Sequence, residues 1–77
     1  MLKLFVRDGC HLCEEAAELL GSLGIGADEV DIADDLEQEL RYGLRIPVLQ
    51  AADGSSELDW PFDAQTLSAW LTAGGPA

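Results

Sequence analysis

Two cysteines with two residues between them are the part of this sequence best suited to chemistry. Cys10 and Cys13 are the chain's two cysteines, and His11 and Leu12 separate them. A cysteine thiolate can attack a disulfide, and a second thiol nearby can then resolve the mixed disulfide that results. The spacing therefore favours thiol–disulfide exchange.

The segments on either side of the pair are typical of a strand and a helix. Residues 2–6 form a short apolar run that suits a buried strand, and residues 11–23 carry apolar side chains at helical spacing. The side chains expected to face a core are Leu12, Ala16, Leu19, Leu20 and Leu23. Unpaired backbone N–H groups at the start of this helix would stabilise a thiolate. We predict Cys10 as the nucleophile and Cys13, one turn further on, as the resolving thiol that forms a disulfide with it.

The charges near Cys10 act in opposite directions. Arg7 and a protonated His11 would lower the pKa of its thiol, so His11 is a candidate tuning residue. The alternative for His11 is a solvent-facing place in the first helical turn. Carboxylates close in sequence would raise the pKa. They are Asp8, Glu14 and Glu15.

Two other interpretations of the cysteines are inert buried thiols and a metal site. A structural zinc site usually has four ligands from Cys, His or carboxylates. The chain has two cysteines and one histidine, so a site would need a carboxylate or a second subunit. We expect no metal site and no bound cofactor.

Length and charge restrict the classes of partner. The 77 residues suit a single domain, 1–77, with the last few residues frayed. A net charge of −11 with four basic residues disfavours binding to nucleic acid and to anionic membranes. No segment has the pattern of a signal peptide or a membrane span. We expect a cytoplasmic monomer.

The remaining pattern predicts an α/β domain with the order βαβαββα. Strands are expected at residues 29–32, 46–50 and 57–60, the last two joined by a turn at Asp53-Gly54. Helices are expected from the capping pair 34–35 to Tyr42 and after Asp63, with Gly74-Gly75-Pro76 ending the last. The first strand, helix and second strand suit a parallel unit, and the final hairpin adds antiparallel strands. The result is a four-stranded mixed sheet with flanking helices, in which the aromatic residues serve packing. These are Trp60, Phe62 and Trp70.

The order of these segments resembles the glutaredoxins, and especially short bacterial glutaredoxin-like proteins. The resemblance rests on the Cys-x-x-Cys pair, the segment Ile46-Pro47-Val48-Leu49 and the element order along nearly the whole chain. It implies a minimal thioredoxin fold in which the Ile46-Pro47 bond is cis and lies beside the cysteines. A proline placed there would let Ile46 present backbone groups to an extended substrate. The alternative for Pro47 is an ordinary proline at a strand edge.

The resemblance also implies glutathione as a candidate co-substrate, although the chain departs from the family pattern. His11 and Leu12 stand where glutaredoxins usually have Pro and Tyr, and the usual Gly-Gly and acidic pair before the last helix are missing. Arg7 fits the basic residue common three positions before the first cysteine. Arg45 either meets a glutathione carboxylate or pairs with Glu37 or Glu39 on the surface.

We therefore interpret the chain as a thiol–disulfide oxidoreductase of glutaredoxin-like type that acts on protein or small-molecule disulfides. Its expected substrate-binding residues are Arg7, Arg45, Ile46 and Pro47. One alternative is a thioredoxin-like reductant of protein disulfides that is independent of glutathione. Another is a non-enzymatic interaction or metal-carrying module, including one that shares an iron–sulfur cluster between two chains.

Overall fold

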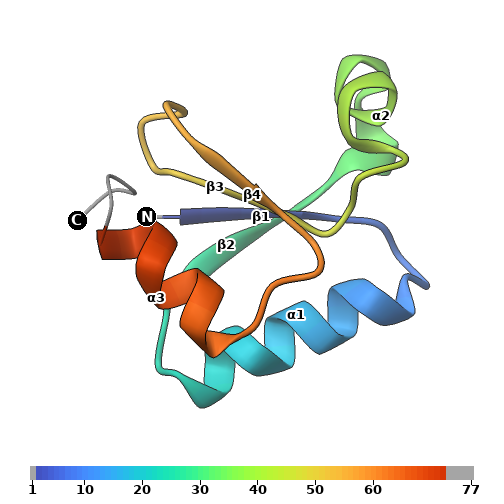
Figure 1. Cartoon of the computed structure of the whole chain (residues 1–77). Coiled ribbons are helices and arrows are strands. Elements are labelled where there is room, and N and C mark those ends of the chain that lie inside the picture. The colour runs from blue at the N-terminus through green and yellow to red at the C-terminus, as the bar shows by residue number, and fades with distance from the viewer. Residues whose placement is uncertain (1, 73–77) are drawn as a thin grey trace.

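The computed structural model describes residues 2–72, which form a four-stranded mixed sheet and three α-helices (Figure 1). The predicted α/β class and element order are confirmed. In chain order the elements are β1 (Leu2–Val6), α1 (His11–Ser22), β2 (Ala27–Asp31), a 3₁₀ turn (Ile32–Asp34), α2 (Leu36–Tyr42), β3 (Val48–Gln50), β4 (Glu57–Asp59) and α3 (Ala64–Thr72).

Strand β1 lies inside the sheet, whose strand order is β2-β1-β3-β4. It pairs in parallel with β2, so that Val6 lies opposite Asp31. It pairs in antiparallel with β3, so that Phe5 lies opposite Val48. The end of β1, the end of β2 and the start of β3 therefore meet at one edge of the sheet, and the chain leaves this edge toward Cys10.

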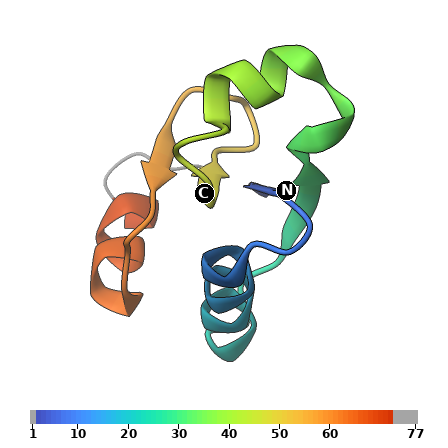
Figure 2. The same ribbon diagram turned by 90° about the vertical axis from the view of Figure 1, so that its right-hand side faces the viewer.

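Helices cover both faces of the sheet. Helices α1 and α3 lie on one face and α2 lies on the other (Figures 1 and 2). Alternate residues of β1 supply both layers, because successive side chains of a strand point to opposite faces. The larger core, under α1 and α3, contains Leu2, Leu4, Ala16, Leu20, Leu49, Phe62 and Leu67. The smaller core, under α2, contains Phe5, Ile32, Tyr42 and Val48.

Side-chain caps fix where the two later helices begin. The Asp35 carboxylate accepts hydrogen bonds from the N–H groups of Glu37 and Gln38, at 2.9 and 3.2 Å. The Asp63 carboxylate accepts one from Thr66 at 2.8 Å. The predicted caps are therefore confirmed at Asp35 and Asp63, whereas Asp34 belongs to the preceding 3₁₀ turn.

The core-facing side of α1 is narrower than predicted. Its buried residues are Cys13, Ala16 and Leu20, whereas Leu12 and Leu23 are exposed by 45% and 42%. The prediction was wrong for these two leucines. One lies in the first helical turn beside the buried Cys13, and the other follows the last helical residue as its C-cap.

Three strand boundaries also differ from the sequence pattern. Strand β2 begins at Ala27, and Ile32 is a buried residue of the 3₁₀ turn that follows it. Strand β3 begins after Pro47, because proline has no N–H to donate to a neighbouring strand. Strand β4 ends at Asp59, one residue earlier than predicted.

The aromatic residues near the C-terminus pack as expected. Phe62 is buried in the larger core, and half-buried Trp60 and Trp70 pack against it. The indole N–H of Trp70 also donates a hydrogen bond to Ser56 Oγ at 2.8 Å. The predicted stop at Gly74-Gly75-Pro76 lies outside the described residues. Within residues 2–72, no helix combines the length and the apolar character that a membrane crossing requires.

The core assignment predicts a large difference between two leucine truncations. Leu67 of α3 is fully buried, so Leu67→Ala should lower the free energy of unfolding by about 2–5 kcal/mol. Leu40 of α2 is 79% exposed, so Leu40→Ala should change it by less than about 0.5 kcal/mol. Urea unfolding followed by tryptophan fluorescence measures both. Equal effects of the two truncations would contradict the assigned core.

Candidate active site

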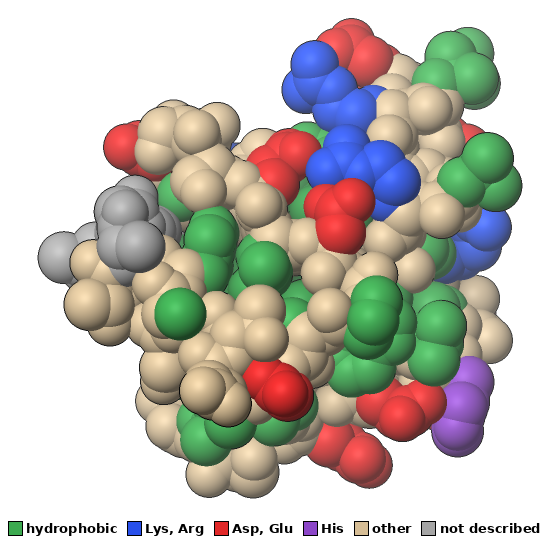
Figure 3. Space-filling view, viewed as in Figure 1, with side chains coloured by type: hydrophobic (Ala, Val, Ile, Leu, Met, Phe, Trp, Pro, Cys, Tyr) green, Lys and Arg blue, Asp and Glu red, His purple; other side chains and the backbone are tan. Residues whose placement is uncertain are grey.

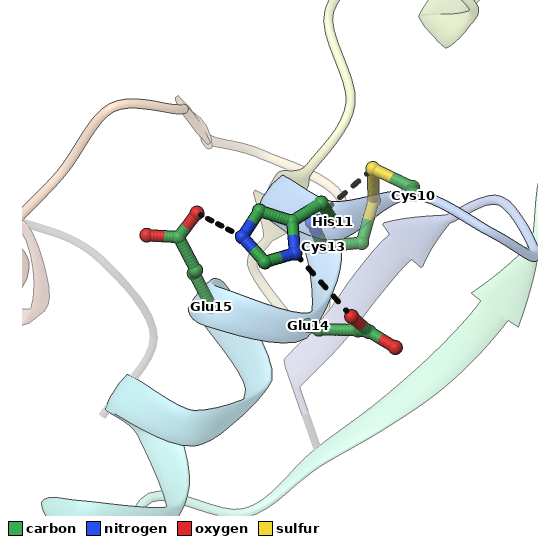
Figure 4. Close-up of a disulfide and its surroundings, with 5 residues drawn as sticks. All are labelled: Cys10, His11, Cys13, Glu14 and Glu15. Atoms are coloured by element: carbon green, nitrogen blue, oxygen red, sulfur yellow. Dashed lines mark hydrogen bonds and ion pairs between the residues drawn. A yellow bond between two sulfur atoms is a disulfide. The ribbon is translucent and has the colours of Figure 1, made fainter.

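The two cysteines form a disulfide at the start of α1, with their Cα atoms 5.2 Å apart (Figure 4). Cys10 is the N-cap residue of this helix and has extended backbone angles, φ −85° and ψ 108°. Its Sγ accepts a hydrogen bond from the N–H of Cys13 at 3.1 Å. The sulfur thus takes the place of the usual capping oxygen, where the helix N-terminus favours negative charge.

A tight turn after β1 sets the position of Cys10. The Cys10 N–H donates a hydrogen bond to the Arg7 carbonyl at 3.2 Å. Within the turn, Gly9 has a φ of 78°, in the left-handed region that glycine adopts without steric cost. Another residue at this position would strain the turn that leads into the helix.

The two sulfur-bearing residues differ in access to solvent. Cys10 is half-buried, whereas Cys13 is only 4% exposed and packs toward the interior. A molecule approaching from solvent therefore has more access to Cys10 than to Cys13. This order supports Cys10 as the nucleophile and Cys13 as the resolving thiol.

An open groove of about 760 Å³ lies beside the disulfide and is lined by Cys10, Cys13 and residues of β2. Its charged lining is mostly acidic, with five carboxylates, and Arg7 is the basic residue among the described residues that line it. The carboxylates are Asp8, Glu14, Glu18, Glu29 and Asp31. A thiolate at Cys10 would therefore share its surroundings with several negative charges, which oppose its formation.

The His11 side chain is exposed in the first turn of α1, with 84% of its surface accessible. Its Nδ1 lies 3.7 Å from Glu14 Oε2, and its Nε2 lies 3.6 Å from Glu15 Oε2 (Figure 4). In Figure 3, acidic side chains lie beside this purple histidine, and the blue basic side chains gather above it. When protonated, His11 would therefore be partly neutralised by its two glutamates before it could act on Cys10.

The Ile46-Pro47 bond is cis, and the sheet register brings it to the edge where Cys10 lies. The Pro47 carbonyl accepts a hydrogen bond from the Trp60 N–H at 3.1 Å, and the Ile46 N–H donates to the Tyr42 carbonyl at 3.0 Å. Of the backbone groups expected to meet a substrate, the Ile46 N–H is thus already used within the protein.

Arg45 is held on strand β4. Its Nε and one terminal nitrogen bind the two oxygens of Asp59, at 3.0 and 2.7 Å, and the same nitrogen binds Glu57 at 2.9 Å. The expected surface partners of Arg45 were Glu37 or Glu39, and that pairing is wrong. Glu57 further accepts hydrogen bonds from the Tyr42 hydroxyl at 2.6 Å and from Gln50 at 3.2 Å. This polar cluster ties the segment before Pro47 to the edge strand.

The cluster holds its carboxylates in the ionised form. Hydrogen bonds from Arg45 lower the pKa of Asp59, and partial burial opposes this effect without cancelling it. Partial burial raises the pKa of Glu57, but hydrogen bonds from Tyr42, Arg45 and Gln50 together bring it below its usual range. In return, hydrogen bonds with Asp59 and Glu57 raise the pKa of Arg45.

The structure brings some of the sequence-predicted residues together and separates others. Arg7, Cys10 and Cys13 line one groove, and Pro47 lies at the same edge of the sheet. Arg45 does not line this groove, and its guanidinium is engaged by β4. Its role toward a glutathione carboxylate stays a prediction.

Sequence reasoning missed the contribution of β2 to the groove. Glu29 and Asp31 lie on this strand and line the groove together with Glu18 of α1. A signal for Asp31 was present, because a parallel pairing of the first two strands places their carboxyl ends side by side. The partners of Arg7 and Arg45 are distant in sequence, and no local pattern marks them.

No group of three or more His, Cys, Asp or Glu side chains within residues 2–72 is arranged to hold a metal ion. The disulfide occupies both sulfurs in this structure.

Residues 1–72 match the family described as Glutaredoxin-like domain (DUF836). The chain belongs to this glutaredoxin-like family. A search of curated proteins found no match. The resemblance proposed from the sequence is thus confirmed at the level of the family.

Solved structures of similar proteins share the fold. The X-ray structure of target protein XcR50 from X. campestris is 51% identical, with a TM-score of 0.88, and the match covers 96% of this chain and 99% of that chain. The solution structure of protein Ne2328 from Nitrosomonas europaea is 30% identical, with a TM-score of 0.76, and covers 90% and 87%. The thioredoxin-like α/β architecture is therefore confirmed.

The polar cluster around Arg45 predicts a pH dependence of stability. The folded pKa values of Glu57 and Asp59 lie below their usual values, so their stabilising effect is fully present above about pH 4.5 and is lost as the pH falls through the folded values. The variant Arg45→Gln should lose less unfolding free energy than the parent chain between about pH 5 and pH 2. Urea unfolding at each pH measures this loss.

A matched control is Lys3→Gln, which removes one positive charge from an exposed residue of β1. Between about pH 5 and pH 2, this variant should lose as much unfolding free energy as the parent chain, so the slope of unfolding free energy against pH stays the same. If both variants flatten the slope equally, the effect comes from net charge and not from the contacts of Arg45.

Proposed function

We propose that this protein is a thiol–disulfide oxidoreductase of glutaredoxin-like type. The observation that carries the proposal is the Cys10–Cys13 disulfide at a helix N-terminus, with the Cys10 side half-buried and the Cys13 side buried. Membership of the glutaredoxin-like family supports it. Its substrates would be protein or small-molecule disulfides, and it would act as a cytoplasmic monomer.

The reaction follows from the two sulfurs. In the reduced protein, the Cys10 thiolate attacks one sulfur of a substrate disulfide, a mixed disulfide forms, and the other substrate sulfur leaves as a thiolate that takes up a proton. The Cys13 thiolate then attacks the Cys10 sulfur, so that the protein disulfide forms and the second substrate thiolate leaves. The substrate gains two electrons and two protons. A thiol donor, such as glutathione or a protein dithiol, restores the reduced protein.

The helix N-terminus is the group that favours the first step. The hydrogen bond from the Cys13 N–H to the Cys10 sulfur, at 3.1 Å, would strengthen when this sulfur becomes a thiolate. The acidic lining of the groove opposes the same step, because its carboxylates repel a thiolate at Cys10. We therefore expect a smaller fraction of Cys10 thiolate at neutral pH than a neutral groove would give.

The charge of the groove favours the thioredoxin-like variant of this function over a glutathione-dependent one. Glutathione carries net negative charge, whereas the groove carries five carboxylates and Arg7. Arg7 and Arg45, the arginines expected to bind glutathione, are each paired with carboxylates of the protein. A second candidate function is therefore reduction of protein disulfides with a protein dithiol as donor.

The proposed reaction predicts different roles for the two cysteines. Reduced Cys13→Ser should accumulate a stable mixed disulfide with a small aromatic disulfide, because the resolving thiol is absent. Cys10→Ser should react slowly, because the remaining thiol is buried. Intact-mass spectrometry after timed mixing measures both. Equal rates for the two variants would contradict the assigned order of attack.

The acidic groove predicts that the reaction rate depends on the charge of the disulfide substrate. The reduced protein should react about tenfold faster with cystamine, a dicationic disulfide, than with the dianionic dithiodiglycolate, once each rate is divided by the rate with free dithiothreitol. Neutral hydroxyethyl disulfide should fall between them. Salt should reduce the difference, because the Debye length falls from about 30 Å at 0.01 M to about 3 Å at 1 M.

A pair of double variants tests whether the groove or the whole chain sets this preference. Glu18→Gln with Glu29→Gln neutralises two exposed groove residues, and Asp34→Asn with Glu37→Gln neutralises two exposed residues outside it. Only the first pair of substitutions should reduce the difference between the normalised reaction rates with cystamine and with dithiodiglycolate. If both pairs narrow it equally, net charge alone explains the preference.

A further inference from the structure

An ion pair connects α2 to the turn that carries Cys10. One terminal nitrogen of Arg7 pairs with Oε1 of Glu39, and both side chains are partly buried, at 39% and 34% exposure. Through its backbone carbonyl, the same Arg7 accepts the hydrogen bond from the Cys10 N–H. Arg7 therefore contacts the active-site turn with its backbone and α2 with its side chain.

Gly43 lies at the end of α2, next to this ion pair. A Cβ atom at residue 43 would lie 2.5 Å from the Glu39 carbonyl oxygen, 3.3 Å from its Oε1 and 3.4 Å from the paired Arg7 nitrogen. Its φ of −53° is open to any residue, so glycine is required here for space and not for backbone conformation. A side chain at residue 43 would collide with the Glu39 carbonyl of α2, and the paired side-chain atoms of Glu39 and Arg7 lie beside the same position.

Arg7 lines two hollows of the surface. It lines the groove beside the disulfide, and it also lines a second hollow of about 510 Å³ formed by α2 and the segment after it. Among the residues that the structure describes, no hydrogen bond joins the Arg7 side chain to either sulfur. In the disulfide form, the charged partner of Arg7 is Glu39 of α2, and the disulfide is neutral.

Reduction of the disulfide gives Arg7 a second possible partner, because a thiolate at Cys10 is an anion with which the guanidinium can pair. The charged groups that face Cys10 or line its groove come from the turn, α1 and β2. They are Arg7, Asp8, His11, Glu14, Glu18, Glu29 and Asp31. All of these groups except Arg7 and His11 disfavour the thiolate. The pKa of the Cys10 thiol therefore depends strongly on whether Arg7 pairs with Glu39 or with the thiolate.

We propose that Glu39 is a positioning residue that holds Arg7 on α2 and competes with the Cys10 thiolate for it. This role rests on the proposed function, in which Cys10 is the nucleophile. Glu39 thereby raises the pKa of the Cys10 thiol without touching the sulfur. Formation of the thiolate draws Arg7 away from α2, so the redox state of the cysteine pair changes how firmly this helix is held.

The test is the pH profile of Cys10 alkylation by iodoacetamide in the reduced protein, with the alkylated residue identified by mass spectrometry. Glu39→Gln should move the midpoint down by about 0.5 pH units, which is about a threefold gain in thiolate below the midpoint. Arg7→Gln should move it up. Glu37→Gln, an exposed neighbour on α2 with the same change in charge, should leave it within about 0.1 of the parent value.

The double variant decides whether the effect passes through Arg7. In the Arg7→Gln background, Glu39→Gln should no longer move the midpoint, because the arginine that it releases is absent. An equal shift in both backgrounds would show direct repulsion between Glu39 and the thiolate, and no shift in either would show no coupling. Either result would overturn the proposal.

This experiment needs no disulfide substrate and no electron donor. If the protein failed to turn over disulfides, the alkylation profile would still report the link between Glu39 and Cys10. Thermal unfolding of each variant verifies that it is folded, and a shift that follows only the melting temperature would also count against a positioning role.

Discussion

The structure depends on strand β1, which pairs with a strand on each side and has a hydrophobic core on each of its two faces. Its parallel pairing with β2 and antiparallel pairing with β3 bring three chain segments to one edge of the sheet. Leu4 anchors the layer under α1, and Phe5 stacks on Tyr42 of α2 with ring centroids 4.2 Å apart. The turn that leads to Cys10 starts from this fixed strand, so the position of the sulfur is set by packing on both sides.

The sequence predicted the fold well where local chemistry and apolar spacing agreed. Asp35 and Asp63 begin helices because their carboxylates accept the unpaired N–H groups, and this signal can be recognised in the sequence itself. The 3₁₀ turn at Ile32 could not be predicted in this way. A buried isoleucine after an alternating segment looks like one more strand residue until the tertiary contacts with Tyr42 are known.

The same division applies to the candidate site. The paired cysteines were evident from spacing, and the cis bond before Pro47 followed from the resemblance and not from composition. The charge partners were not predictable, because Glu39 and Asp59 lie far along the chain from Arg7 and Arg45. Ion pairs of this kind depend on which surfaces the topology brings together, and several acidic residues offer equally suitable partners in the sequence.

The unequal burial of the two sulfurs has a consequence for any covalent complex that this protein forms. A bulky partner can reach the Cys10 side of the disulfide more easily than the Cys13 side, because Cys13 is only 4% exposed. Attachment would then occur at one sulfur, and the conjugate would be a single linkage isomer with one orientation of the partner. Such a homogeneous adduct is well suited to structure determination of a bound partner, because every molecule in the sample presents the same junction.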